Sequence, residues 1–395
     1  MSDNWPNLSG KTILQVIPDL AAGGAERTTV EMAQAITGAG GIALVASTGG
    51  RLEDALKAAG GELIAMNMAT KNPLAVRANT TKLVKLIKSR GIDVIHARSR
   101  APGWSAYMAA QRTDTPFVTT YHGAYSGTSG LKRKYNSVMA KGELVIANSE
   151  WTAAHVHAVH GTPKDKVVTI PRGVDFATFD PAKVSAERQA ALAKSWGLEL
   201  GGTRLNLVLP GRLTDWKGQR VAIEAMALLD GDERARLHLI LPGDDQGRSK
   251  YVAELTDAIE AHGLTANVSL TGHCEDMPAA YALADIVLAP SKRPEAFGRV
   301  AAEASAMGKP VIVADHGGQR EIVVEGQTGI RVEPGSASAL AAAIRTLINL
   351  RPEARSAMGE AGRDHVSTRF SKKQLQTATL NVYARVLGLT EEVES

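Results

Sequence analysis

Short apolar runs alternate with longer stretches of helical periodicity along most of the 395 residues. Runs of this length and composition predict buried strands, and the stretches between them predict helices. In the first half the predicted strands lie at 11–20, 42–48, 62–68, 94–98, 117–123 and 144–150. The predicted helices lie at 25–40, 52–60, 75–91 and 103–112. Strands that alternate with helices in this way favour a parallel, doubly wound α/β sheet.

The second half repeats this rhythm after a break at 167–181, where two prolines and a glycine interrupt the pattern. We therefore predict two α/β domains, residues 1–180 and 181–370, each built on its own doubly wound sheet. The predicted strands of the second domain lie at 205–212, 237–243, 268–273, 286–291, 310–315 and 329–334. Its predicted helices lie at 186–197, 220–229, 250–263, 277–284, 299–308 and 337–349. A last amphipathic helix follows at 371–389.

Composition narrows the class of protein that two such domains can form. Apolar residues make up 44% of the chain and charged residues 22%, which is ordinary for a globular protein. A net charge of +4 with only 4% aromatic residues argues against nucleic-acid binding, but it suits an acidic substrate or an anionic membrane surface. The single cysteine, Cys274, excludes an internal disulfide and favours a cytoplasmic protein. No apolar run approaches the ~18 residues of a membrane span, and the first residues lack a signal-peptide pattern.

The segment 294–329 places two carboxylates around the start of a predicted helix. Glu295 precedes the helix and Glu303 lies inside it, so the two carboxylates should be on the order of 10 Å apart. A retaining glycoside hydrolase needs a closer pair, at roughly 5 Å. The wider spacing suits a ligand with hydroxyl groups at both ends and a diphosphate between them. Acidic residues at a helix start also occur as a solvated pair that the helix dipole favours, so the spacing alone does not decide.

Basic residues and glycines mark a second candidate anion site. Arg212 and Lys217 lie in a strand-to-helix turn, and Gly218 stands next to the helix start. Two cations beside helix amides suit a diphosphate. In the first half, Gly23 and Gly24 form a similar turn before a helix, but the dinucleotide fingerprint Gly-x-Gly-x-x-Gly is absent, which disfavours a dehydrogenase.

Together these motifs resemble the nucleotide-sugar site of retaining glycosyltransferases of family 4, which have the GT-B fold. The resemblance is carried by PEAFGRVAAEASAMGKPVIVADHGG at 294–318, GRLTDWKG at 211–218 and GGAE at 23–26. It implies two Rossmann-like domains facing across a cleft, with residues 371–395 packing back on the first domain. It also implies transfer of a sugar from a UDP-, GDP- or ADP-sugar to a glycan or lipid-linked acceptor, with retained configuration. The pathway it implies is bacterial lipopolysaccharide or envelope polysaccharide synthesis.

The resemblance assigns roles to individual residues. Arg212 and Lys217 match cations that stabilise the leaving diphosphate. Glu295 matches a contact to the donor sugar, and Glu303 matches a ligand of the ribose. His122 ends a predicted strand, where a histidine is often structural, but it matches a family histidine near the anomeric centre. The expected catalytic residues are thus His122, Arg212, Lys217 and Glu295. The expected donor-binding residues are Gly23, Gly24, Gly211, Gly243, Gly272, Phe297, Gly298, Arg299, Val300 and Glu303.

No metal ion or other cofactor is expected. Histidine, cysteine and acidic residues show no metal-ligand spacing, since Asp244 and Asp245 are adjacent rather than separated. Arg212 and Lys217 would neutralise the diphosphate in place of Mg²⁺. Ser149 is expected to cap the helix that follows it.

The segment 131–142 has two interpretations. On a helix, Leu131, Tyr135, Val138 and Met139 share one side, and basic residues lie beside and opposite them. Such a helix either packs its apolar side into the core or docks on anionic lipid. The second interpretation predicts a protein that is peripheral on the inner face of the plasma membrane.

Two other functions remain open at this level. One is a GT-B enzyme that epimerises a sugar nucleotide, and the other is a catalytically silent module that binds nucleotide sugars. The paired glutamates disfavour the epimerase, and the intact set of charged residues disfavours the silent module.

Overall fold

The computed structural model describes residues 5–21, 23–123, 125 and 129–389. These form two compact units, one from Met1–Pro171 with Lys372–Ser395 and the other from Arg172–Ser371. The sequence had placed the boundary between the domains at residue 180. No helix among the described residues has both the length and the apolar character that crossing a membrane requires.

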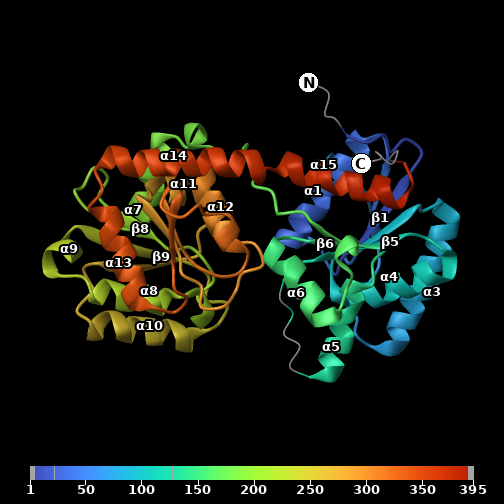
Figure 1. Cartoon of the computed structure of the whole chain (residues 1–395), viewed down its shortest axis with the longest axis horizontal. Helices are drawn as coiled ribbons and strands as arrows, with labels where there is room; N and C mark the ends of the chain where they lie inside the picture. Colours follow the sequence, from blue (N-terminus) through green and yellow to red (C-terminus); the bar gives the residue numbers. More distant parts are fainter. Residues whose placement is uncertain (1–4, 22, 124, 126–128, 390–395) are drawn as a thin grey trace. The chain divides into compact units, whose positions relative to one another are not determined.

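The first unit is built on a seven-stranded sheet in the order β3-β2-β1-β4-β5-β6-β7, and all of its described strand pairs are parallel (Figure 1). Its strands are β1 Thr12–Val16, β2 Ile42–Ser47, β3 Glu62–Ala65, β4 Val94–Ala97, β5 Phe117–Tyr121, β6 Leu144–Ala147 and β7 Val167–Thr169. Its helices are α1 Gly24–Gly38, α2 Glu53–Ala58, α3 Pro73–Arg90, α4 Arg100–Thr113, α5 Gly130–Asn136, α6 Glu150–His160 and α15 Lys372–Val386.

The second unit is built on a six-stranded sheet in the order β10-β9-β8-β11-β12-β13, again parallel throughout its described pairs. Its strands are β8 Leu205–Val208, β9 Leu237–Pro242, β10 Val268–Gly272, β11 Ile286–Ala289, β12 Val311–Ala314 and β13 Gly329–Val332. Its helices are α7 Ala186–Ser195, α8 Gln219–Ala227, α9 Gly231–Ala235, α10 Ser249–Ala261, α11 Met277–Leu283, α12 Arg299–Ala306, α13 Ala337–Ile348 and α14 Pro352–Arg369.

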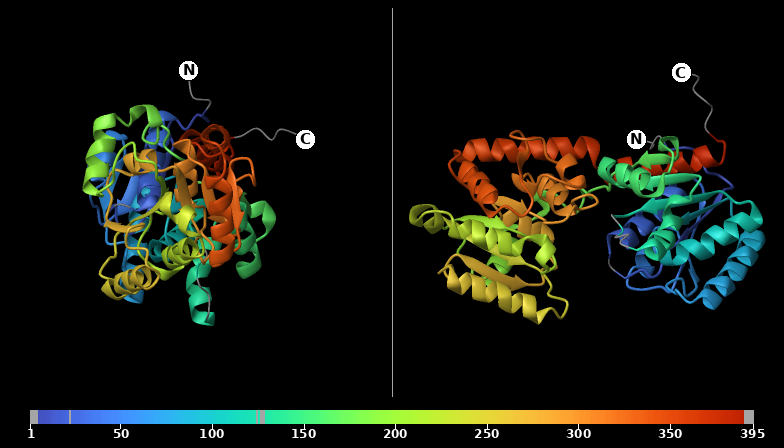
Figure 2. Two further views of the ribbon diagram at one scale, coloured as in Figure 1. Left: turned by 90° about the vertical axis from the view of Figure 1, so that its left-hand side faces the viewer. Right: turned by 60° about the horizontal axis from the view of Figure 1, so that its bottom comes forward.

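Helices cover both faces of each sheet, and Figure 2 shows this from two further directions. Neighbouring residues of one strand point to opposite faces. Ile13 therefore joins the apolar cluster under α1, α2 and α15, whereas Leu14 joins the cluster under α3 and α4. In the second unit, Leu207 packs with α8, α10 and α13, and Val208 packs with α7, α11, α12 and α14. This two-sided burial explains why the strands are continuous apolar runs.

Strand order reverses once in each sheet, between β1 and β4 in the first unit and between β8 and β11 in the second. Loops leave these neighbouring strands toward opposite faces, so a crevice opens at the carboxyl ends of the strands. Ligands of doubly wound proteins bind at this point. We therefore expect a ligand site at the loops after β8 and β11, and at those after β1 and β4.

Most predicted elements are confirmed, and the doubly wound sheets are among them. The short strand β7, the short helix α9 and the long helix α14 were not predicted. The helix predicted over 131–142 is wrong in extent, because α5 ends at Asn136 and a 3-10 turn, Ser137–Ala140, follows it. Val138 and Met139 are fully buried in the core of the first unit, so this part of the expected apolar side packs inward, whereas Leu131 is exposed.

Helix α15 is tied to the first sheet by a buried histidine. His96 on β4 lies 2.7 Å from the hydroxyl of Tyr383 on α15 through Nδ1, and 2.7 Å from the hydroxyl of Thr120 on β5 through Nε2. A neutral imidazole carries one donor and one acceptor, so it can satisfy both hydroxyls. Burial holds the pKa of His96 well below its ordinary value of 6.5, and the nearby Arg98 guanidinium lowers this pKa further.

We expect the free energy of unfolding to fall as the pH drops below about 6.5. In that range the unfolded chain binds a proton at His96 and the folded chain does not, so acid favours the unfolded state. One such histidine contributes up to about 1.4 kcal/mol per pH unit. Denaturant unfolding of a His96→Gln variant should therefore show a shallower loss of stability between pH 7 and pH 5 than wild type, whatever its stability at pH 7. An equal slope in the two proteins would contradict this assignment.

Candidate functional site

A largely buried ion pair joins the loops that follow β8 and β11, at the switch point of the second sheet. Lys217 Nζ lies 2.8 Å from Glu295 Oε1, and the two side chains are only 13% and 12% exposed. The hydroxyl of Ser291 donates to the same carboxylate oxygen. Of the ammonium's three donors, this contact uses one and leaves the others for a ligand.

The loop that carries Glu295 is fixed by close backbone packing against the loop after β12. Gly318 N donates to Glu295 O at 2.7 Å. Gly298 has a φ of 105°, and a Cβ at this position would lie 2.5 Å from Cβ of Gln319 and 2.8 Å from its Cα. Only glycine fits both the dihedral and the space. The turn before α12 is therefore rigid, and the amides of Arg299 and Val300 begin the helix just after it.

Glu303 lies in the first turns of α12 and is 8% exposed. Its Oε1 accepts from Arg299 Nε at 3.0 Å and Nη2 at 2.6 Å, and its Oε2 accepts from the Tyr281 hydroxyl at 3.0 Å. Burial and the Glu303 carboxylate raise the pKa of Tyr281 well above its ordinary value, so the phenol stays protonated and donates. The carboxylate is thus oriented by two partners and keeps further lone pairs for hydroxyl groups.

The other predicted residues of the second unit occupy neighbouring positions on the same edge of the sheet. Arg212 follows β8 and is exposed, and its guanidinium has no hydrogen-bond or ion-pair partner among the described residues. Gly211 N donates to Pro242 O at 3.0 Å, and Gly243 N donates to Gly272 O at 2.7 Å. These bonds connect the carboxyl ends of β8, β9 and β10. The side chain of Phe297 points elsewhere, since it is 4% exposed and packs on Phe370 in the core.

Three predicted residues belong to the first unit. Gly23 and Gly24 follow β1, and Gly23 is the N-cap of α1 without a side chain to cap it. His122 follows β5 directly, its backbone N–H donates to the Tyr125 hydroxyl at 3.4 Å, and its carbonyl accepts from Asn148 Nδ2 at 3.3 Å. The predicted residues therefore form one group on each unit, both at carboxyl ends of parallel strands.

Several residues that shape the second-unit group were not anticipated. Ser291 and Tyr281 hold the two glutamates, as described above. Lys292 pairs with Asp215 at 2.7 Å, and its backbone N–H donates to Trp216 O at 2.7 Å, which ties the β11 loop to the β8 loop a second time. Tyr281 and Lys292 carry no local sequence signal, because they lie 22 and 77 residues along the chain from the residues they contact. Ser291 is only four residues before Glu295.

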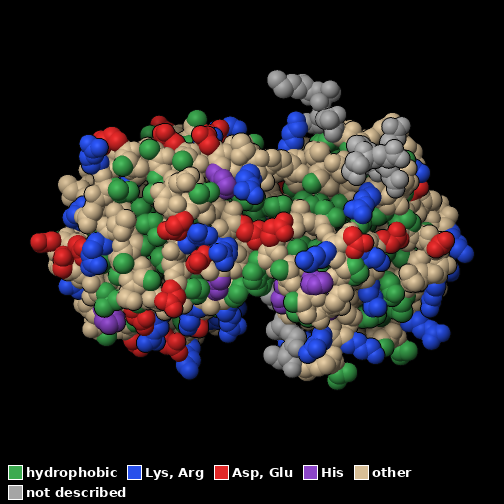
Figure 3. Space-filling model, viewed as in Figure 1, with side chains coloured by type: hydrophobic (Ala, Val, Ile, Leu, Met, Phe, Trp, Pro, Cys, Tyr) green, Lys and Arg blue, Asp and Glu red, His purple; other side chains and the backbone are tan. Residues whose placement is uncertain are grey.

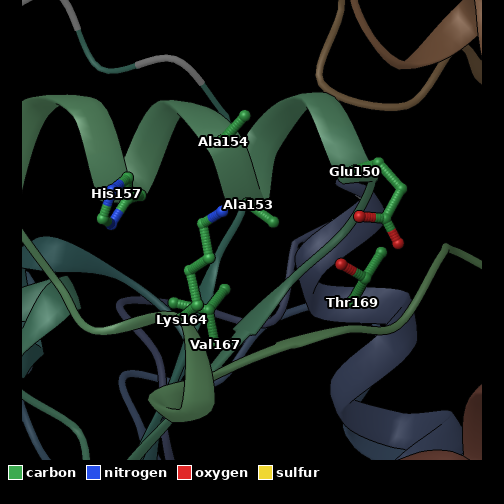
Figure 4. A pocket seen from close by; sticks show the side chains of 7 residues that line it. All are labelled: Glu150, Ala153, Ala154, His157, Lys164, Val167 and Thr169. Carbon is green, nitrogen blue, oxygen red and sulfur yellow. The ribbon is translucent and has the colours of Figure 1, made fainter.

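A cavity of about 430 Å³ lies in the first unit between α6 and β7 (Figure 4). Glu150 and Thr169 lie toward one end and His157 lies toward the other.

Ser149, the residue before α6, accepts from Thr152 N at 3.0 Å, which confirms the predicted helix cap. The cavity is lined by none of the predicted site residues. Across the part of the chain that the structure describes, no three His, Cys, Asp or Glu side chains gather as a metal site would require.

Comparison with protein families gives two matches that follow each other along the chain. Residues 22–178 match the model described as Glycosyltransferase Family 4, and residues 194–365 match the model described as Glycosyl transferases group 1. The first match begins just before Gly23, and the second contains every predicted residue of the second unit.

Known proteins of this class resemble the chain over most of its length. A D-inositol 3-phosphate glycosyltransferase from Xylanimonas cellulosilytica is 30% identical over 74% of this chain and 72% of its own. A glycosyltransferase from Rickettsia africae superposes with a TM-score of 0.86 at 32% identity, covering 96% of this chain and 99% of its own. The structure of Anabaena HepE in complex with UDP and glucose superposes with a TM-score of 0.79 at 25% identity, covering 94% and 99%. The chain therefore belongs to the group 1 glycosyltransferases and has their GT-B fold.

Proposed function

We propose that the protein transfers a sugar from a nucleotide diphosphate sugar to a hydroxyl group of a glycan or lipid-linked acceptor, with retention of the anomeric configuration. The observation that carries this proposal is the group at the β8–β11 switch point. The Lys217–Glu295 pair joins the two loops, the exposed Arg212 follows β8, and the oriented Glu303 lies in the first turns of α12. Cations and helix amides suit a diphosphate, and carboxylates suit the hydroxyl groups of a ribose and a sugar on either side of it.

Each residue then has a defined task. Arg212 and the remaining donors of Lys217 stabilise the negative charge that develops on the leaving diphosphate. Glu303 accepts hydrogen bonds from ribose hydroxyls, and Glu295 accepts from the donor sugar. His122 contacts the transferred sugar near its anomeric carbon. The acceptor oxygen forms the new bond to that carbon on the face from which the diphosphate departs, and the acceptor proton passes to the departing phosphate oxygen.

The relatives support the proposed donor and suggest classes of acceptor. HepE in complex with UDP supports a uridine nucleotide as the first donor to test. Similar curated proteins bear the names D-inositol 3-phosphate glycosyltransferase and glycogen synthase, the latter from Mycobacterium tuberculosis at 26% identity. A polyol phosphate and a glucan are thus the acceptor classes that relatives suggest. Lipopolysaccharide or envelope polysaccharide synthesis stays a prediction from the sequence, as does attachment to a membrane.

The proposal predicts that UDP raises the thermal unfolding midpoint of the wild-type protein, since a ligand at a hundred times its dissociation constant stabilises by about 2.7 kcal/mol. In a Glu303→Gln variant this shift should largely disappear, because the amide keeps the shape but loses the charge that pairs with Arg299 and accepts from the ribose. Glu224→Gln on the exposed side of α8 is the matched control and should respond like wild type. GDP and ADP tested in parallel identify the base. If no nucleotide shifts the wild-type midpoint, the proposed function fails.

Arg212 should matter for turnover and not for folding. Replacing it with alanine removes a charge that acts on the leaving diphosphate, so we expect kcat to fall roughly 10²-fold. Arg220→Ala, on the exposed side of α8, removes an equal charge outside the group and should leave kcat unchanged. Single-turnover assays with a UDP-sugar and NMR of the product report both the rate and the anomeric configuration. Equal rates in the two variants would contradict the role of Arg212, and an inverted product would contradict retention.

Transfer should persist in excess EDTA, because Arg212 and Lys217 supply the positive charge that a metal ion would otherwise bring to the diphosphate. The measurement is the initial rate of UDP release before and after chelation, with a Mg²⁺ add-back. Complete loss on chelation that Mg²⁺ or Mn²⁺ restores would show that the two cations do not suffice.

A further inference from the structure

A basic cavity of about 690 Å³ lies in the first unit, beside the carboxyl end of β4. Its polar lining consists of Lys71 just before α3, Ser99 and Arg100 at the start of α4, and Ser129, Lys132 and Tyr135 along α5. In Figure 3, Lys and Arg side chains gather on the part of the first unit where Figure 1 draws α3 and α5. None of the residues assigned to the transfer reaction lines this cavity.

The charge in the cavity is uncompensated. Lys71 and Lys132 are exposed and have no ion-pair partner within the described parts of the chain. The Arg100 guanidinium donates to Asn136 Oδ1 at 2.9 Å and lies over the Tyr125 ring at 4.2 Å, and both of these partners are neutral. No acidic residue occurs among the described residues of the lining. Three cations that converge without a counter-charge repel one another, and a bound anion would remove that repulsion.

Neutral donors add to the cations. Helix α4 begins at Arg100, and the side chain of its N-cap, Ser99, makes no capping hydrogen bond, so the first amides of α4 are left to other acceptors. The hydroxyls of Ser99, Ser129 and Tyr135 lie in the same lining. Cations, hydroxyls and a helix start together match the many acceptor oxygens of a phosphate better than the two of a carboxylate.

The walls of the cavity are fixed before any ligand arrives. Trp104 Nε1 donates to Tyr135 O at 3.0 Å, which joins α4 to α5, and the Arg100–Asn136 bond joins them a second time. Ser105 Oγ donates to Val76 O at 3.2 Å, which joins α4 to α3. A site whose walls are already tied loses less freedom when a ligand binds.

The cavity is connected to His122 through one side chain. Arg100 stacks on the ring of Tyr125, and the hydroxyl of Tyr125 accepts from the backbone N–H of His122. An anionic group beside Arg100 would therefore lie one side chain away from the backbone of His122, the residue proposed to contact the transferred sugar. Leu131, which is 83% exposed, also lines the cavity and offers an apolar contact at its rim.

We propose that this cavity binds a phosphate group of the acceptor and directs the acceptor hydroxyl toward His122. The inference rests on the proposed function in one respect, since it takes the anion to be part of the acceptor. The volume holds more than a phosphate ion, which suits a phosphate ester whose remaining atoms continue toward Tyr125. The phosphate belongs either to a water-soluble polyol or sugar phosphate or to a lipid headgroup.

The test compares two double variants that remove equal charge from the same two helical regions. Lys71→Gln/Lys132→Gln neutralises the lining, whereas Lys82→Gln/Lys134→Gln neutralises exposed lysines of α3 and α5 outside it. Binding of inorganic phosphate is measured by calorimetry at low salt with UDP saturating, so that the second-unit group is occupied. We expect roughly millimolar affinity in wild type, at least tenfold weaker binding in the first variant (about 1.4 kcal/mol) and an unchanged affinity in the second.

Equal phosphate affinities in the two double variants, or no phosphate binding by wild type, would overturn the assignment. Sedimentation with phosphatidylglycerol vesicles, against phosphatidylcholine vesicles, then identifies the source. Binding that only the Lys71→Gln/Lys132→Gln variant loses assigns the site to a lipid headgroup, and any other vesicle result assigns it to a water-soluble phosphate. Thermal shifts with UDP keep the two proposals apart. If the phosphate assignment is wrong, UDP still raises the unfolding midpoint. If the donor assignment is wrong and UDP does not bind, phosphate binding is measured without UDP in the same variants.

Discussion

The ion pair between Lys217 and Glu295 is the contact on which the second unit's functional edge depends. It joins the loops of two neighbouring strands whose following helices lie on opposite faces of the sheet, so it spans the crevice that the topology opens. Both groups are about seven-eighths buried, and removing one would leave the other charged and unpaired at a cost of about 3–5 kcal/mol. The pair therefore fixes the loop geometry and keeps a cation in the crevice in the absence of ligand.

The sequence predicted the sheets well because the inner strands, such as β1, β4, β5 and β11, are buried on both faces, which makes them largely apolar runs. Helix α14 was not predicted, because it buries few apolar side chains. Its described buried residues are Gly359, Gly362 and Val366, and Gly359 packs directly against the backbone of Gly308. A helix that makes its contacts through glycine leaves no apolar stripe to detect. Strand β7 has only three residues and adjoins the proline-rich connection, so its run was too short to separate from a linker.

At the candidate site, too, local sequence patterns predicted only part of the structure. Arg212, Lys217, Glu295 and Glu303 could be selected because the strand-to-helix turns that carry them are local patterns. The contacts between distant segments could not be predicted, since Tyr281 reaches Glu303 from α11 and the Lys217–Glu295 pair closes across 78 residues. Only folding brings these groups together. The apolar side expected for 131–142 failed for a related reason, because the chain turns after Asn136 and carries Val138 and Met139 into the core.

The two units treat positive charge in different ways, and the difference suits different ligands. In the second unit Lys217 is paired with a carboxylate, so a diphosphate bound as proposed would share the cation with Glu295, which would moderate the gain in free energy on binding. A nucleotide held in this way would leave more readily after transfer. In the first unit Lys71, Arg100 and Lys132 have no ion-pair partner among the described residues, so an anion bound there would not compete with a carboxylate. Because Arg100 stacks on Tyr125, whose hydroxyl accepts from the backbone N–H of His122, the proposed charge recognition and hydroxyl placement would be coupled through Tyr125. An acceptor without an anionic group would lose both the attraction and the alignment, and the basic cavity would then select acceptors as well as bind them.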